Sequence, residues 1–220
     1  VFINLYTANR ADHNKLIVGV TADYPPFEYI ENGELKGFDI DLAKAIAQEL
    51  NRATEFKDLP FSALLHSLNS GKINIAVSSI SATPERSEYL SFSRPYYHTQ
   101  LALVSLKERS LSSLEELTAD MVIGIQLGSI MEQLVNSVPN RSFSVLRLNS
   151  NLLIIQEIMS KKLDASIIEL DQAVRLTAEN EGLAYYPLDI LKYAGFSQLY
   201  GYSVAFRKGS SLIYPVNNAL

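Results

Sequence analysis

The sequence contains no cysteine, so the chain can form no disulfide and offers neither a thiolate nucleophile nor a thiolate metal ligand. It has no apolar run near the ~20 residues that are needed to cross a bilayer. Its histidines, His13, His66 and His98, lack the spacing of zinc ligands. The sequence contains no Gly-x-Ser-x-Gly motif, the pattern that would indicate a serine nucleophile. We therefore expect no metal, no cofactor and no catalytic residues.

The sequence has no excess of positive charge, since it contains 19 lysines and arginines but 24 acidic residues, and its net charge is −5. Nucleic-acid-binding proteins usually carry a basic face, so we expect no nucleic-acid partner. The 220 residues suit one large or two small globular domains. The apolar segment Val1–Ala8 could be the end of a secretion signal or an ordinary terminus. The lack of cysteine is compatible with an oxidising compartment.

The first half of the chain alternates between strand and helix patterns. A hairpin signal at Asn32–Gly33 follows the first strand. Asp39 and Asp41 begin a helix, where acidic residues complement the helix dipole, and Pro60 begins a second helix. The predicted strands are Lys15–Val20, Thr54–Leu59 and Ile73–Val77. This β-α-β-α-β order is typical of a parallel sheet covered by helices.

The second half repeats the alternation. Its predicted strands are Leu101–Val104, Val122–Ile125, Ser144–Leu148, Ala165–Ile168 and Tyr202–Phe206. Its predicted helices follow Gly128–Ser129 and cover Leu152–Met159, Asp171–Ala178 and Ser211–Leu220. No Gly/Ser-rich or Pro-rich linker separates the halves, so we expect two α/β units joined by short extended crossings. Such sheets bind ligands at the carboxyl ends of their strands.

The segment Ser78–Arg86 (SSISATPER) directly follows a predicted strand, at such a carboxyl end. An arginine fork pairs bidentately with a carboxylate, and turn amides add donors, so the segment could bind an acidic group. The alternative is a helix cap with Thr83 at the N-cap, Pro84 at N1 and a solvent-exposed Arg86. The two interpretations are compatible, because the cap does not use the guanidinium.

Other candidates are weaker on local signal alone. Gln126–Ile130 (QLGSI) joins a strand to a helix, where amides favour anions, but a tight turn is the simpler explanation. Glu169 ends an apolar strand, and a buried carboxylate needs a cationic partner, either a ligand ammonium or a surface lysine. Tyr24 and Phe61 could form aromatic walls, although aromatic residues at such positions more often belong to the core.

Together these segments resemble the polar amino-acid-binding family of extracellular solute-binding proteins, which has the type II periplasmic binding fold. The matching stretches are Tyr24–Tyr29 (YPPFEY), Gly37–Ala43 (GFDIDLA), Phe61–Leu68 (FSALLHSL), Lys72–Arg86 (KINIAVSSISATPER), Gly124–Ser129 (GIQLGS) and Leu163–Ala165 (LDA). They occur in the order of the family. The combination is specific, although no single stretch is.

The resemblance implies two α/β lobes, each a mostly parallel sheet covered by helices, with two hinge crossings between them. The first lobe would comprise residues 1–100 and 201–220, and the second lobe residues 101–200. The family ends in a longer C-terminal helical segment than Ser211–Leu220. We therefore expect the C-terminal helix to be truncated in this chain.

The binding roles of the family transfer to this sequence by position. Arg86 would bind the α-carboxylate of a ligand. Ser81 and the amide of Ile130 would donate hydrogen bonds to the same carboxylate from opposite lobes. Glu169 would accept the α-ammonium group, together with the backbone carbonyl of Ser79.

The ligand side chain is expected between the rings of Tyr24 and Phe61, with polar groups at the far end from Thr21, Asp23, Ser78 and Gln126. A guanidinium stacks well on aromatic faces and uses several acceptors, so arginine is the favoured ligand. The sequence departs from the family pattern at Thr21, where many relatives for basic amino acids are acidic. It also departs at Ile130, where threonine is frequent, and at Glu169, where aspartate is common.

The resemblance implies a secreted, monomeric protein of the periplasm or the extracellular space that is not an enzyme. It would close by hinge motion around a polar or basic L-amino acid and deliver it to the membrane permease of an ABC transporter. One alternative is the ligand-sensing domain of a membrane receptor. Another is an enzyme similar to cyclohexadienyl dehydratases, with Glu169 as the general acid.

Overall fold

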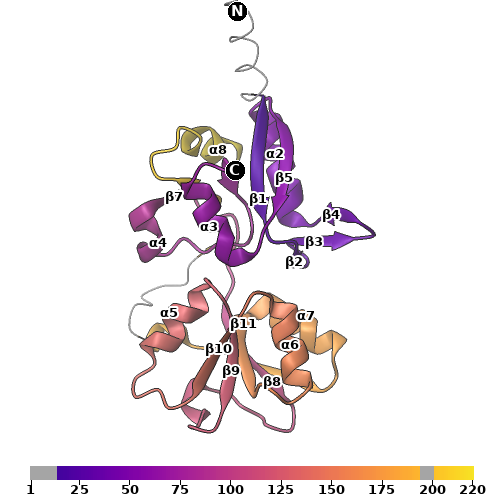
Figure 1. Cartoon of the computed structure of the whole chain (residues 1–220), viewed down its shortest axis with the longest axis vertical. Coiled ribbons are helices and arrows are strands. Elements are labelled where there is room, and N and C mark those ends of the chain that lie inside the picture. Colours follow the sequence, from indigo (N-terminus) through magenta and orange to yellow (C-terminus); the bar gives the residue numbers. More distant parts are fainter. Residues whose placement is uncertain (1–13, 194–200) are drawn as a thin grey trace, which may run out of the picture. The chain divides into compact units, whose positions relative to one another are not determined.

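The computed structural model describes residues 14–193 and 201–220, which fold into two compact α/β units (Figure 1). Unit 1 comprises Val1–Tyr97 and Gly201–Leu220, and unit 2 comprises His98–Tyr200. Each unit contains a five-stranded sheet with helices on both faces. The proposed end of a secretion signal, Val1–Ala8, lies outside the described residues.

The main sheet of unit 1 has the strand order β5-β1-β6-β13-β7. Its strands are β1 (Lys15–Val20), β5 (Ala53–Asp58), β6 (Ile75–Ala76), β7 (Leu90–Phe92) and β13 (Ala205–Arg207). A smaller sheet contains β2 (Asp23–Tyr24), β3 (Glu28–Glu31) and β4 (Glu34–Lys36). The predicted hairpin turn joins β3 to β4, and both Asn32 and Gly33 have the positive φ that a tight turn requires.

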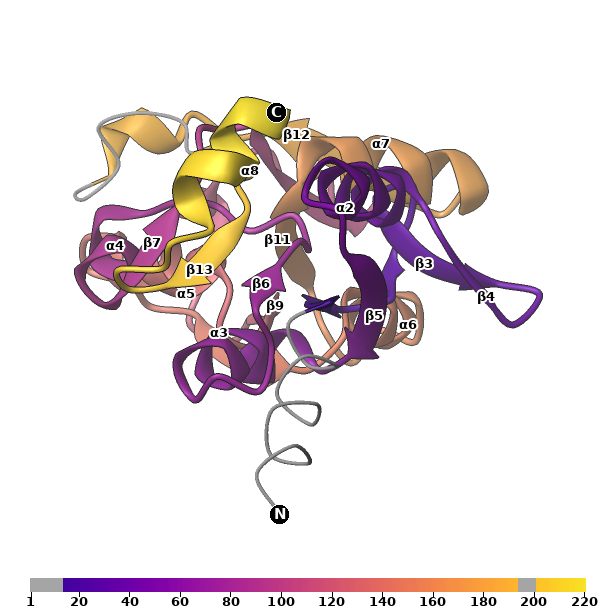
Figure 2. The same ribbon diagram turned by 90° about the horizontal axis from the view of Figure 1, so that it is seen from above.

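Helices cover both faces of the unit 1 sheet, as the view from above in Figure 2 shows. They are α2 (Phe38–Glu49), α3 (Phe61–Asn69), α4 (Pro84–Tyr89) and α8 (Ile213–Ala219). On one face, Ile40 of α2 and Val216 of α8 share a core cluster with Val18 of β1. On the other face, Leu64 and Leu68 of α3 form a second cluster. Successive side chains of β1 point to opposite faces of the sheet, so this strand contributes to the core on each face.

The sheet of unit 2 has the strand order β10-β9-β11-β8-β12. Its strands are β8 (Leu101–Leu106), β9 (Val122–Gln126), β10 (Ser144–Leu148), β11 (Ala165–Glu169) and β12 (Leu183–Pro187). Its helices are η1 (Leu114–Glu116), α5 (Ile130–Ser137), α6 (Asn151–Met159), α7 (Leu170–Glu179) and η2 (Ile190–Lys192). Ile154 of α6 and Leu176 of α7 pack with Val104 on one face. Leu134 of α5 packs with Ile167 on the other.

The predicted α/β fold with mostly parallel sheets is confirmed, because in each five-stranded sheet a single strand runs against the other four. In unit 1, β1 is parallel to β5 and β6, whereas β13 is antiparallel to β6 and β7. In unit 2, β9 is parallel to β10 and β11, whereas β8 is antiparallel to β11 and β12. β8 is the first strand of its unit and β13 is the returning strand of the other. Within residues 14–193 and 201–220, no crossover helix joins either strand to a neighbour in its sheet.

Gly37 is required where the small sheet of unit 1 meets α2. Its φ is +121°, and a Cβ atom there would lie 2.2 Å from the carbonyl oxygen of Phe27. This close approach lets the first amides of α2 bond to the preceding segment. Phe38 N–H donates to the Pro26 carbonyl at 3.0 Å and Asp39 N–H donates to the Phe27 carbonyl at 2.8 Å. These bonds satisfy amides that lack intrahelical acceptors, in place of a side-chain cap.

Gly37→Ala should therefore lower the free energy of unfolding of unit 1 by about 2–5 kcal/mol, through positive-φ strain and the clash with Phe27. Gly33→Ala is the matched control, because Gly33 also has a positive φ but no atom lies within 4 Å of its added Cβ. It should cost only about 1–2 kcal/mol. Urea unfolding measures both. Equal losses in the two variants would show that the close approach to Phe27 contributes nothing.

Candidate functional site

The carboxyl ends of β1, β5 and β6 meet at one edge of the unit 1 sheet, because these strands are parallel. Thr21 follows β1, Leu59 follows β5 and Ser78 lies just beyond β6. Thr21 N–H donates to Oγ of Ser78 at 3.0 Å, and Oγ1 of Thr21 donates to the carbonyl oxygen of Leu59 at 2.9 Å. Hydrogen bonds thus tie together the three segments that leave the sheet.

Arg86 lies on α4 near this edge, and the predicted helix cap is confirmed. Thr83 is the N-cap, its Oγ1 accepts from the Arg86 N–H at 3.2 Å, and Pro84 occupies N1. The alternative of a solvent-exposed Arg86 is wrong, since the residue is only 5% exposed. Nη1 donates to the carbonyl oxygen of Ser81 at 2.8 Å, and Cζ lies 5.7 Å from the centre of the Phe61 ring. The helix cap and the ring together hold a buried guanidinium.

The two expected aromatic walls are both packed within unit 1. Tyr24 stacks on Phe27 with ring centres 6.1 Å apart. Phe27 in turn makes edge-on contacts with Tyr97 and Tyr202 at 5.0 and 5.4 Å. Phe61 packs with the core cluster on the α3 face and under Arg86. The rings are therefore rigidly held, and their contact with a ligand stays a prediction.

Two carboxylates lie near Thr21. Asp23, a predicted site residue, belongs to β2, and its N–H donates to the Thr21 carbonyl at 2.9 Å. Asp58 ends β5, in register with Val20, and its Oδ1 accepts from Ala22 N–H at 3.0 Å. Asp58 was not among the predicted site residues, although its place at the end of a predicted strand was a usable signal. Both acids give this edge negative charge.

A pair of buried carboxyl groups lies behind the same edge and is absent from the predicted site. Glu28 of β3 and Asp39 of α2 are 1% and 0% exposed. Oγ of Ser78 donates to Oε1 of Glu28 at 2.8 Å. Ser79 N–H and the Tyr96 hydroxyl donate to Oδ2 of Asp39 at 2.7 and 2.9 Å. Asp39 begins α2 as predicted, but its side chain binds these groups rather than serving the helix dipole at the surface.

Burial sets the ionisation of this pair. Burial raises the pKa of Glu28 well above its usual range, and the Asp39 carboxylate raises it further, against the lowering effect of the Ser78 hydroxyl. Burial also raises the pKa of Asp39, while the Ser79 amide and the Tyr96 hydroxyl lower it. The donors favour the charged form at Asp39, so Glu28 is the better acceptor of a proton.

Unit 2 has a comparable polar edge, where parallel β9, β10 and β11 end. Gln126 and Glu169 are the last residues of β9 and β11, and both are buried. The Gln126 carbonyl accepts from the N–H and Oγ of Ser129 at 3.2 and 2.7 Å, and Gly128 N–H donates to Oε2 of Glu132 at 2.9 Å. These bonds make the QLGSI segment a tight turn, as the simpler interpretation predicted.

Ile130 is the first residue of α5 and follows this turn directly. Amides in the first turn of a helix have no intrahelical acceptor and favour anions. The predicted role of the Ile130 amide in binding a carboxylate is therefore compatible with its place in the helix.

The structure places the predicted residues in two groups, one for each unit. The first group is the carboxyl edge of unit 1, which carries Thr21, Asp23, Tyr24, Phe61, Ser78, Ser79, Ser81 and Arg86. The second is the carboxyl edge of unit 2, which carries Gln126, Ile130 and Glu169. Within the described ranges, no cluster of His, Asp and Glu side chains could hold a metal ion. His13 lies outside those ranges.

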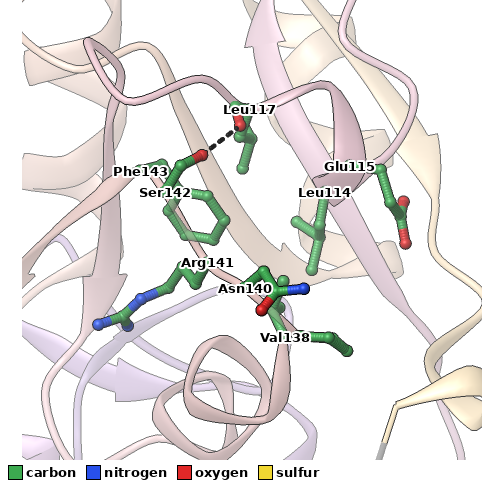
Figure 3. A pocket seen from close by; sticks show the side chains of 9 residues that line it. Leu114, Glu115, Leu117, Val138, Asn140, Arg141, Ser142 and Phe143 are labelled. Carbon is green, nitrogen blue, oxygen red and sulfur yellow. Dashed lines mark hydrogen bonds between the residues drawn. The ribbon is translucent and has the colours of Figure 1, made fainter.

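A cavity of about 270 Å³ lies at the opposite, amino-terminal edge of the unit 2 sheet. It is lined by Leu114, Glu115, Leu117, Val138, Pro139, Asn140, Arg141, Ser142 and Phe143 (Figure 3). The Ser142 hydroxyl donates to the Leu117 carbonyl at 3.2 Å. Lys192 lowers the pKa of Glu115 to about 2 through an ion pair at 2.8 Å. The cavity precedes β9 and β10, so it contains none of the predicted binding residues.

A family match covers both groups of site residues. Residues 16–220 match the model of the bacterial extracellular solute-binding proteins, family 3. The chain belongs to this family. The resemblance found in the sequence is thereby confirmed. Among residues 14–193 and 201–220, no helix is both long and apolar enough to span a membrane.

Individual relatives of this solute-binding protein point to amino acids. It is 35% identical over 215 residues to the arginine-binding extracellular protein ArtP of Bacillus subtilis, which covers 97% of this chain and 82% of ArtP. A substrate-binding protein of an amino acid ABC transporter has a TM-score of 0.84 at 29% identity, covering 93% of this chain and 91% of the other. An ancestral arginine-binding protein bound to glutamine has a TM-score of 0.83 at 36% identity, covering 94% and 90%.

Thr83→Ala should destabilise unit 1 by about 1 kcal/mol, because α4 loses the oxygen that accepts from the Arg86 amide. Thr83→Ser is the control, since it keeps that oxygen and should change stability by only a few tenths of a kcal/mol. Urea unfolding followed by circular dichroism would compare them. A serine variant as unstable as the alanine variant would show that methyl packing, rather than the cap, matters at Thr83.

Proposed function

We propose that this protein binds a free L-amino acid, with arginine preferred, and supplies it to the permease of an ABC transporter. The observation that carries the proposal is the buried guanidinium of Arg86, fixed at the carboxyl edge of a parallel sheet in a member of a solute-binding family. The planar fork of a guanidinium matches a carboxylate and can bind it with two parallel hydrogen bonds. An α-carboxylate is the anion that every amino acid offers.

The α-groups of the ligand would be bound by both units. Arg86 and Ser81 of unit 1 and the Ile130 amide of unit 2 would donate to the carboxylate. Glu169, which is buried at the end of β11, would accept from the α-ammonium, together with the carbonyl of Ser79. One ligand that engages both units would favour closure by hinge motion.

Negative charge near Thr21 supports a basic side chain. Asp23 is near Thr21 in the sequence, and its N–H donates to the Thr21 carbonyl. Asp58 is near Thr21 in space, because its carboxylate accepts from the adjacent Ala22 amide. They could replace the acid that is missing at Thr21 itself. Rigid rings at Tyr24 and Phe61 would then stack on a guanidinium. The relation to ArtP agrees with this preference.

We also propose that the protein acts outside the cytoplasm as a monomer and has no enzymatic activity. Family membership and the relation to amino-acid-binding proteins of transporters support this proposal. Turnover assays with prephenate and arogenate would test the dehydratase alternative, in which Glu169 is a general acid.

Calorimetry with ligand-free protein should give the order arginine, then lysine, with glutamine and histidine weaker. Lysine loses the planar stacking and fork geometry, roughly 0.5–2 kcal/mol, and should bind about 2- to 30-fold more weakly. Asp58→Asn and Asp23→Asn should weaken arginine more than glutamine. Asp41→Asn, an exposed acid on α2, is the control and should change neither. Tighter binding of glutamine than of arginine would contradict the basic-ligand proposal and leave only amino-acid binding.

Arg86→Ala should lower the affinity for arginine by about two to three and a half decades, because it removes a buried charged partner worth roughly 3–5 kcal/mol. Arg207→Ala removes an exposed arginine at the end of β13 in the same unit and should leave affinity unchanged. Circular dichroism would verify that both variants fold. A change of less than about threefold in Arg86→Ala would mean that the carboxylate is bound elsewhere.

A further inference from the structure

The loop that carries Ser79 and Ser81 is attached at several points to the rest of unit 1. Ser79 has a φ of +49°, in the left-handed region, which is unfavourable for a residue with a Cβ atom. The Ile80 carbonyl accepts from Ser203 N–H at 2.9 Å, and Ala82 N–H donates to the Gly201 carbonyl at 3.3 Å. The strained residue is thus held by specific bonds, the shortest of which comes from its own N–H.

That bond goes to Asp39, at 2.7 Å from Ser79 N to Oδ2. The single hydroxyl hydrogen of Ser79 lies between two carboxyl groups, with Oγ 3.3 Å from Oε2 of Glu28 and 3.5 Å from Oδ2 of Asp39. It can serve only one of them at a time. Among the described residues, neither Glu28 nor Asp39 forms an ion pair with a cation.

One donor is missing from this cluster. Oδ1 of Asp39 is buried, and no donor from the described residues reaches it. The carboxyl groups of Glu28 and Asp39 are neighbours, because the Ser79 hydroxyl oxygen lies within 3.5 Å of an oxygen of each. Two adjacent buried carboxylates cannot both carry a charge without a large cost, whereas a proton on Glu28 would remove one charge and supply a donor to Asp39.

We propose that Glu28 and Asp39 share one proton, and that this protonated pair positions Ser79 and the loop to Arg86 for ligand binding. Glu28 is the neutral partner, and it accepts from the Ser78 hydroxyl. Asp39 is the charged partner, and it accepts from the Ser79 amide and the Tyr96 hydroxyl. Both acids are positioning residues, because they act on the ligand through Ser79.

The groups that face the pair come from several elements. Asp39 is on α2 and Glu28 on β3, Ser78 and Ser79 follow β6, and Tyr96 follows β7. Burial and the two carboxylates raise the pKa of Tyr96 well above its usual range, so its hydroxyl remains a donor up to high pH. Tyr202 adds to this effect on Tyr96. The titration expected with rising pH is therefore the loss of the shared proton.

The sign of the pH effect follows from the raised pKa of Glu28. The folded protein binds this proton more tightly than the unfolded chain. The resulting stabilisation is complete below the usual glutamate pKa and is lost as the pH rises through the raised value. Ionised Glu28 would also repel Asp39 and so disturb Ser79. Affinity should therefore fall over the same upper pH range.

Glu28→Gln distinguishes a shared proton from a merely structural glutamate. The amide keeps an oxygen for the Ser78 hydroxyl and places a permanent N–H donor towards Asp39. Glu28→Ala removes both and leaves Asp39 with a buried, unsatisfied oxygen. Asp41→Asn is the matched control, because Asp41 lies two residues from Asp39 on α2 but is exposed.

The first measurement needs no ligand. Infrared spectroscopy at neutral pH should show the carbonyl band of a protonated carboxylic acid in the unmodified protein and in Asp41→Asn, and no such band in Glu28→Gln. Urea unfolding should show that the stability of the unmodified protein relative to Glu28→Gln decreases with rising pH. A missing band in the unmodified protein, or one that persists in Glu28→Gln, would overturn the proposal.

The second measurement uses L-arginine as the probe and rests on the proposed function. Glu28→Gln should bind arginine within about threefold of the unmodified protein and with no loss as the pH rises, whereas Glu28→Ala should lose about tenfold or more. A glutamine variant as weak as the alanine variant would contradict a positioning role for the proton. No arginine binding in the unmodified protein would refute the proposed function, while the infrared band would still decide whether the pair shares a proton.

Discussion

The hydrogen bond from Ser79 N–H to Asp39 links the frame of unit 1 to the edge at which we propose that the ligand binds. Asp39 is placed by the start of α2, which in turn depends on the close approach of Gly37 to Phe27. Ser79 begins the loop to Arg86 in a left-handed conformation that it would not adopt alone. A buried carboxylate accepts such short N–H bonds strongly, because no water competes for it. The geometry of the edge is therefore decided by groups behind it.

Recognition of the α-groups and recognition of the ligand side chain are assigned to different kinds of structure at this edge. In the proposed function, the α-groups would be recognised by elements with little freedom, namely a capped helix under Arg86 and a bonded loop at Ser79 and Ser81. The ligand side chain would be recognised by acids near Thr21, such as Asp58, which is exposed and held by one amide. Changing an exposed acid disturbs little packing. Substitution of such an acid would therefore change the preference among amino acids without altering the frame.

Most of the fold could be predicted from the sequence, because apolar periodicity marks every helix that covers a sheet and every buried parallel strand. β7 and β12 fell outside the predicted strands, and the antiparallel direction of β8 and β13 was missed. These features depend on which strands become neighbours, and local patterns do not encode that. For the site, the position of Arg86 after β6 was visible in the sequence. Its burial was not, since the cap signal of Thr83 fits an exposed arginine equally well.

The buried pair of Glu28 and Asp39 was also missed, because local sequence patterns do not show which segments become neighbours in the fold. Asp39 has the sequence signature of a helix start, and Glu28 lies in a hairpin strand, so each has an ordinary surface explanation. Only the fold brings them together, because the β3 hairpin and α2 are joined through Gly37 and both face the segment after β6. A buried acid without a cation must lose its charge or gather donors. In the proposed pair, Asp39 keeps its charge and accepts the hydrogen bonds, whereas Glu28 is protonated.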